Sequence, residues 1–149
     1  MTVLGKNYVH VLVIGNGFDL NLGLPTSYTD FLDSHHFEAF RIKAPIMSKR
    51  LTAVQRNNGW VDIEDELARF GRTATNSYRI STDFKKEYDN LRLSLTDYIN
   101  DLDYSAIDQD SQAAKVIREL SNKDNLMHGL CVVNFNYTES LAKLDGLGS

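Results

Sequence analysis

Two short polar clusters, each at the end of an apolar run, carry the residue types best suited to ligand chemistry. Gly15-Asn16-Gly17 follows the apolar run 8–14, and the cluster 134–138 (Asn-Phe-Asn-Tyr-Thr) ends the apolar run 130–135. Glycine lets a phosphate or ribose approach the backbone N–H groups, and asparagine amides offer both donors and acceptors. These residues predict a site for a small polar ligand such as a nucleotide.

Asp19, two residues after Gly17, is the candidate for ribose binding or acid–base chemistry. Helix capping is the alternative role for the same side chain. The two glycines are expected to adopt backbone conformations that other residues avoid. Leu20 stands where the dinucleotide fingerprint G-x-G-x-x-G has its third glycine. A tight strand-to-helix turn without a ligand is therefore the alternative interpretation.

A parallel sheet is needed to bring the two clusters together. In open parallel sheets, ligands bind beyond the carboxyl ends of the strands. The runs 8–14 and 130–135 predict two such strands, and their continuous apolar character predicts that both sheet faces are covered. Asn16 and Asn134 are 118 residues apart in the sequence, yet the clusters meet in space if the two strands are neighbours.

Between the strands, apolar spacing and helix-breaking residues predict a mostly helical segment. Ser27 and Asp30 have the spacing of a capping box for a helix that starts near Tyr28, and Gly71 is expected to end a later helix. The expected helices cover 18–22, a segment from 28, 37–55 (in two pieces divided at Pro45), 60–71, 83–101 and 111–120. Most of them form a helical insertion over about 36–126.

Only two strands are expected, and a parallel sheet of that size is too small to stand alone. The 149 residues are therefore interpreted as a single α/β domain, 1–149, with a parallel-sheet core and the helical insertion. They are also expected to be the incomplete N-terminal part of a longer protein.

Charge and cysteine content restrict the partners and the compartment. The net charge of −4 and the pI near 5.5 provide no basic surface for nucleic acid, so nucleic-acid binding is not expected. The single Cys131, expected to be buried in its apolar run, excludes an intrachain disulfide. No signal peptide and no long apolar run is visible. These features favour a cytoplasmic protein without membrane contact.

Acidic residues and histidines elsewhere show no metal-ligand pattern. Asp62 and Glu64 are two residues apart, a spacing that does not bring them to one helix face. His35 and His36 have no accompanying ligands in the sequence. No metal is predicted. The alternative is a metal-dependent nuclease or phosphohydrolase in which Asp19 joins these two acids around a divalent ion.

Three ordered blocks of the sequence form a recognisable combination. The first consists of 13–20 (VIGNGFDL) followed by 23–32 (GLPTSYTDFL), the second is 60–64 (WVDIE), and the third is 133–138 (VNFNYT). Together they resemble the AbiH family of bacteriophage abortive-infection proteins, from residue 13 to residue 138. This resemblance implies an antiphage protein.

AbiH proteins are also distantly similar to sirtuin-like domains, which implies a Rossmann-like fold with NAD as the ligand. Gly23-Leu24-Pro25 is similar to the sirtuin G-[IL]-P segment, and Asn136-Tyr137 to the T-x-N-[YI]-D strand end, where Thr138 replaces the acid. Sirtuin-like enzymes further use a downstream His-Gly pair. His128-Gly129 precedes the strand, so this chain is expected to lack the general base and to bind without turnover.

The first hypothesis is thus an antiphage protein that binds a nucleotide such as NAD and, in a longer form, hydrolyses it. Asn136 and Asp19 are its expected catalytic residues. The expected ligand contacts are Gly15, Asn16, Gly17, Phe18, Gly23, Pro25, Thr26, Ser27, Tyr28, Asn134, Tyr137 and Thr138. The remaining alternative is a non-catalytic sensor or assembly module, in which the helical middle of the chain contacts a phage-derived trigger or another subunit. An exposed apolar patch on the helix 83–102 would support this alternative.

Overall fold

The computed structural model describes residues 10–58, 63–74, 78–121 and 130–144. The chain divides into two compact units: Met1–Pro25 with Asp103–Ser149, called here the sheet unit, and Thr26–Leu102, called the helical unit. The expected insertion over about 36–126 includes residues of both units. The apolar residues between 103 and 121 pack in the core of the sheet unit, with residues of β1 and α1.

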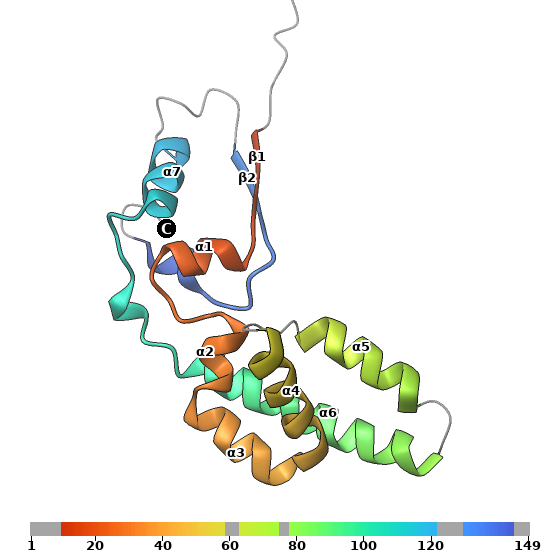
Figure 1. The fold of residues 1–149 in the computed structure, drawn as a ribbon. Coiled ribbons are helices and arrows are strands. Elements are labelled where there is room, and N and C mark those ends of the chain that lie inside the picture. Colours follow the sequence, from red (N-terminus) through yellow and green to blue (C-terminus); the bar gives the residue numbers. More distant parts are fainter. Residues whose placement is uncertain (1–9, 59–62, 75–77, 122–129, 145–149) are drawn as a thin grey trace, which may run out of the picture. The chain divides into compact units, whose positions relative to one another are not determined.

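In the sheet unit, two parallel strands lie side by side (Figure 1). β1 (His10–Ile14) pairs with β2 (Leu130–Asn134), from His10 opposite Leu130 to Ile14 opposite Asn134. The prediction that these two strands are parallel neighbours is confirmed. The other elements of this unit are α1 (Asn16–Asn21), α7 (Gln112–Ser121) and two 3₁₀ helices, η1 (Tyr104–Ala106) and η2 (Ser140–Lys143).

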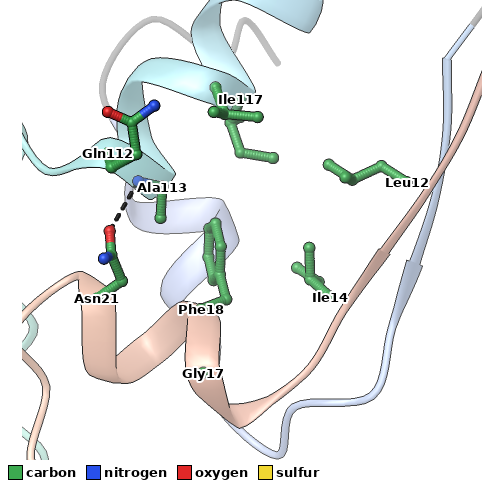
Figure 2. A pocket seen from close by; sticks show the side chains of 9 residues that line it. Leu12, Ile14, Gly17, Phe18, Asn21, Gln112, Ala113 and Ile117 are labelled. Carbon is green, nitrogen blue, oxygen red and sulfur yellow. Dashed lines mark hydrogen bonds between the residues drawn. The ribbon is translucent and has the colours of Figure 1, made fainter.

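Helices cover one face of this sheet within the described residues. Leu12 and Ile14 point toward side chains of α1 and α7 (Figure 2). The buried residues on this side are Leu22, Leu24, Ile107, Ala114, Ile117 and Leu144. Ala114 and Ile117 lie three residues apart on α7 and so share one face of that helix.

The other face of the sheet is exposed. Val11 and Val13 are 61% and 60% exposed, and Cys131, opposite Val11 in the register, is exposed as well. The expectations of two covered faces and of a buried Cys131 are therefore wrong. Successive side chains of a strand point to opposite faces, and α1 and α7 lie on the same side of the β1–β2 pair.

The helical unit packs its helices around a separate core. Its elements are α2 (Tyr28–Leu32), α3 (His35–Lys43), α4 (Pro45–Asn58), α5 (Ile63–Ala74) and α6 (Tyr78–Asn100). The long α6 packs against α3, α4 and α5. The most deeply buried side chains of this core are Phe31, Phe40, Met47, Leu51, Ile63 and Leu91.

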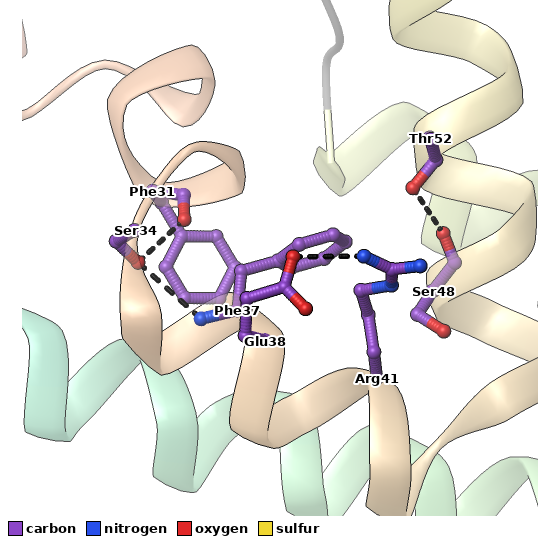
Figure 3. Close-up of polar contacts among 7 residues, drawn as sticks. All are labelled: Phe31, Ser34, Phe37, Glu38, Arg41, Ser48 and Thr52. Carbon is purple, nitrogen blue, oxygen red and sulfur yellow. Dashed lines mark hydrogen bonds and ion pairs between the residues drawn. The ribbon is translucent and has the colours of Figure 1, made fainter.

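Short-range hydrogen bonds determine where α2 and α3 begin. Ser27 accepts from the backbone N–H of Asp30, and the Asp30 carboxylate accepts from the backbone N–H of Ser27 at 2.9 Å. This capping box confirms the prediction. Ser34 caps α3 by accepting from the Phe37 N–H, and its hydroxyl donates to the Phe31 carbonyl (Figure 3). The chain thus turns from α2 into α3 around one serine.

The first turn of α4 is capped from a distance. Pro45 stands at the first position of the helix, where its missing N–H costs no intrahelical bond. The next two backbone N–H groups, those of Ile46 and Met47, donate to the carboxylate of Glu87 on α6 at 3.3 and 2.6 Å. The predicted division of the helix at Pro45 is confirmed, and a buried glutamate supplies its cap.

Two helices extend beyond their predicted ends. α5 continues through Gly71 to Ala74, so Gly71 does not end it. A Cβ at Gly71 would meet Phe84 Cζ at 3.9 Å, an ordinary van der Waals contact. The space around Gly71 therefore allows a larger residue at this helical position. α6 begins at Tyr78, five residues before the expected start. Near the end of α5, Phe70 packs against Phe84 of α6 with ring centroids 5.1 Å apart, a tertiary contact that local helix propensity does not include.

Candidate functional site

The first polar cluster forms the junction between β1 and α1. Gly15 is the N-cap of α1, with an extended backbone (φ −142°, ψ −169°), and its carbonyl accepts from the N–H of Phe18 at 2.8 Å. Gly15 and Gly17 do not have positive φ. The expectation of special backbone conformations is therefore wrong for these two residues. Among the described glycines, the one with a positive φ is Gly23, at +83°.

Gly15 and Gly17 have open space around their Cα atoms, although their backbone conformations are ordinary. A Cβ built at either residue would meet nothing within 4 Å. Packing within the described chain thus gives no reason for glycine at these two positions. The backbone at the start of α1 is consequently open to an approaching molecule, as the predicted ligand site requires.

The second polar cluster continues the sheet and then turns back toward α1. The N–H of Phe135 donates to the carbonyl of Ile14 at 3.0 Å, one position beyond the end of β2. The side chain of Asn134 then accepts from the backbone N–H of Asn136 at 2.8 Å, an Asx-type turn. Because of this turn, the segment after β2 passes beside α1.

Asp19 joins the two clusters. Its side chain on α1 is 1% exposed, and its carboxylate accepts from Asn136 Nδ2 at 3.0 Å, from Thr138 Oγ1 at 2.6 Å and from Ser140 Oγ. Thr138 and Ser140 are also buried. Each hydroxyl has one proton to donate, so the Thr138–Ser140 oxygen contact at 3.1 Å adds no independent bond while both donate to Asp19.

These contacts orient the side-chain amide of Asn136. A carboxylate only accepts, so the Nδ2 group must be the one that faces Asp19. The carbonyl oxygen Oδ1 is then directed elsewhere; it is buried and has no hydrogen-bond partner among the described residues. Buried polar atoms are rarely left unsatisfied. The site therefore presents one acceptor that a ligand donor, such as a ribose hydroxyl, can satisfy.

An apolar pocket of about 300 Å³ lies on the covered face of the sheet (Figure 2). Leu12 and Ile14 of β1 line it, together with Phe18 of α1 and Ile117 of α7. At its rim, Asn21 accepts from the N–H of Ala113 at 2.8 Å and so caps α7. The pocket adjoins Gly17 and is large enough for a planar ring system.

The structure distributes the expected ligand contacts over both units. Gly15–Phe18, Gly23 and Pro25 belong to the sheet unit together with Asn134, Tyr137 and Thr138, whereas Thr26, Ser27 and Tyr28 belong to the helical unit. In the sheet unit Asn134 and Thr138 are engaged internally, and Tyr137 is exposed. In the helical unit Ser27 forms the capping box, and the Tyr28 hydroxyl donates to Glu64 at 3.1 Å.

Ser140 was not predicted from the sequence. It is fully buried and donates to Asp19, but it stands outside the polar cluster, so its position in the sequence gave no signal. The proposed metal group of Asp19, Asp62 and Glu64 gains no support. Asp62 lies outside the described residues, and among those that are described no group of three metal-ligating side chains includes Asp19.

Comparison with known proteins identifies a family. The family model described as bacteriophage abortive infection AbiH matches residues 11–148. No curated protein matches the chain, and no solved structure does. Among the described residues, no helix combines the length and the apolar character that crossing a lipid bilayer requires.

Proposed function

Because the chain belongs to the AbiH family of bacteriophage abortive-infection proteins, we propose that it acts in phage defence by binding a nucleotide, with NAD as the first candidate. The binding site would lie at the joined ends of β1 and β2. This position agrees with the rule that parallel sheets bind ligands beyond the carboxyl ends of their strands. A Rossmann-like, sirtuin-like core is part of the same proposal.

The buried acceptor of Asn136 is the observation that best supports this proposal. Its Oδ1 atom is unsatisfied among the described residues, and its Nδ2 atom is held by Asp19. A ribose hydroxyl would donate to Oδ1, while the open backbone at Gly15 and Gly17 would take the phosphates. Asp19 then acts as a positioning residue, because its carboxylate is buried and already binds three donors.

Hydrolysis of NAD is the reaction that we propose for this site. The bond between nicotinamide nitrogen and ribose C1′ breaks, nicotinamide leaves with the bonding electron pair, and water supplies the hydroxyl at C1′ and releases one proton. Asn136 would orient the ribose or the water. The reaction needs a general base in addition, so binding and orientation are the roles proposed for the residues of this chain.

Substitution of Gly17 gives the sharpest test, because it separates ligand access from folding. A Cβ built there meets no heavy atom of the described residues within 4 Å beyond its chain neighbours and the backbone of its own helix, and Gly17 lies within α1. Gly17→Ala is expected to leave stability unchanged or raise it by about 0.5–1 kcal/mol. Gly17→Leu is expected to weaken NAD binding in calorimetry at least about ten-fold, equivalent to about 1.4 kcal/mol.

Gly71→Ala, a helical glycine in the other unit, is the matched control and should leave NAD affinity unchanged. If the chain shows no NAD binding, the choice of nucleotide fails, and other nucleotides would be tested in the same assay. If Gly17→Leu binds NAD as tightly as the original chain, the location of the site is wrong.

The exposed sheet face favours a second candidate, an assembly module. Val11 and Val13 of β1 and Val133 of β2 are all exposed, and a second copy of the chain that covers them would bury apolar surface. Val13→Lys should then shift the mass measured by light scattering from dimer to monomer. A monomeric mass for the unsubstituted chain would exclude this candidate.

A further inference from the structure

Two histidines and an aspartate meet where α3 begins and α6 ends. His35 and His36 are the first residues of α3, and Asp101 directly follows α6. The His36 Nε2 atom lies 3.2 Å from Asp101 Oδ2, and the two imidazole rings have centroids 4.0 Å apart. One ligand atom from each of the three residues lies within 4.8 Å of the others.

These separations fit a single metal ion. Zinc binds histidine nitrogen and carboxylate oxygen at about 2.0–2.2 Å in a tetrahedral arrangement. At those bond lengths, neighbouring ligand atoms are about 3.3 Å apart, close to the observed separation of 3.2 Å. The third ligand atom, on the exposed His35 ring, lies within 4.8 Å of the other two. Imidazole with a carboxylate is a donor set typical of zinc and its neighbours in the transition series.

The surroundings hold His36 in place. Its ring packs edge-on against Tyr98 of α6, with centroids 5.8 Å apart and an interplanar angle of 75°. Its backbone carbonyl accepts from the Ser94 hydroxyl at 2.8 Å. His36 and Asp101 have side chains that are 12% and 65% exposed, so one ligand is fixed and the other is accessible to solvent. An ion can therefore enter from outside and join a partly prearranged site.

We propose that His35, His36 and Asp101 form a binding site for a divalent transition-metal ion of the Zn²⁺ class, which cross-links α3 and α6 of the helical unit. Three ligands leave a fourth coordination position for water. The positive end of the α3 dipole disfavours a cation, and the Asp101 carboxylate offsets it. Micromolar affinity is therefore expected, rather than the tighter binding of a four-ligand structural site.

Calorimetric titration with ZnCl₂, after removal of bound metal with a chelator, tests the proposal on the whole chain. One ion per chain should bind, and both His35→Ala and Asp101→Asn should weaken the affinity at least about ten-fold. Asp89→Asn removes one exposed carboxylate from α6, three turns before Asp101, and should leave the affinity unchanged. Circular dichroism checks that each variant is folded.

Cobalt provides a second, spectroscopic measurement. Tetrahedral Co²⁺ at the site should give visible absorption bands that disappear in His35→Ala and in Asp101→Asn. Binding of Zn²⁺ that survives both substitutions would overturn the proposal, because the ion would then be held elsewhere, for example at Cys131 or His128. A complete absence of binding to the original chain would overturn it as well.

Discussion

At the scale of single residues, Asp19 connects segments that are far apart in the chain. Its three partners come 117, 119 and 121 positions later. Sequence reasoning selected Asp19 for acid–base chemistry or for helix capping. The structure gives the side chain neither a cap on α1 nor an exposed position. The local sequence shows that an acidic residue follows Gly-Asn-Gly by two positions. It does not show that Asp19 is buried, because the residues that bind its carboxylate lie far away in the chain.

Asp19→Asn tests this connection. In the variant, an NH₂ group replaces one of the two carboxylate oxygens that accept from Asn136, Thr138 and Ser140. An NH₂ group cannot accept, so at least one of these buried hydrogen bonds is lost. The free energy of unfolding should fall by about 1–3 kcal/mol, measured by thermal unfolding. Glu139→Gln removes one exposed acid from the segment that holds Thr138 and Ser140 and should change stability much less. Equal effects of the two substitutions would contradict the role assigned to Asp19.

Tyr98 supplies a pH dependence that can be assigned to one residue. Its burial in the helical core, together with the nearby negative charge of Asp30, raises the pKa of Tyr98 from 10.0 to about 12. The folded chain therefore keeps a proton that the unfolded chain loses above pH 10. Tyr98 stabilises the fold fully below that pH, and the contribution, on the order of 2–3 kcal/mol, is lost as pH rises toward 12.

Tyr98→Phe keeps the ring and removes the titrating group. Denaturant unfolding at pH 9 and at pH 11.5 should show a larger loss of stability for the original chain than for the variant. The contributions of other titrating groups cancel in this difference. If both proteins lose the same stability between the two pH values, burial does not raise the pKa of Tyr98 as described.

At the scale of elements, the cap of α4 is a long-range feature. Glu87 is buried and accepts from the N–H groups of Ile46 and Met47, where the helix dipole favours negative charge. Glu87→Gln should lower the free energy of unfolding by about 1–3 kcal/mol, because one amide N–H then faces another donor. Asp89→Asn, an exposed change on the same helix, should have a smaller effect in the same unfolding measurement.

The helices show which elements local sequence can predict. The capping box of Ser27 and Asp30 and the helix start at Pro45 were both predicted, because they depend on residues within one turn. The cap by Glu87 was not, since it joins positions about forty residues apart. The continuation of α5 past Gly71 likewise depends on packing against α6, which periodicity alone does not reveal.

At the scale of the whole molecule, the sequence predicted the parallel pairing of β1 and β2 but not how their faces are covered. Apolar runs ending in polar clusters indicated two neighbouring strands, and the register from His10 opposite Leu130 confirms them. The same runs suggested two covered faces, yet Val11 and Val13 are exposed. Apolar character shows that a face can be buried, whereas only the arrangement of helices determines which face is.

The candidate site was predicted in part. Gly15–Gly17 and Asn134–Thr138 were expected to meet, and the Phe135–Ile14 and Asn136–Asp19 hydrogen bonds bring them together. The contact of Ser140 with Asp19, and the orientation of Asn136 by Asp19, were not predicted. Both depend on the path of the chain after β2. The His35–His36–Asp101 group depends on the packing of α3 against α6, so no sequence spacing indicated it.

Nuclear magnetic resonance of the ¹⁵N-labelled chain during titration with NAD tests the central claim most directly. We predict that chemical shifts change at the backbone amides of Gly15, Asn16 and Gly17 and at the side-chain amide of Asn136. The chemical shifts of the backbone amides in α3 and α6 should not change. Shift changes confined to the helical unit, with those four groups unaffected, would contradict it.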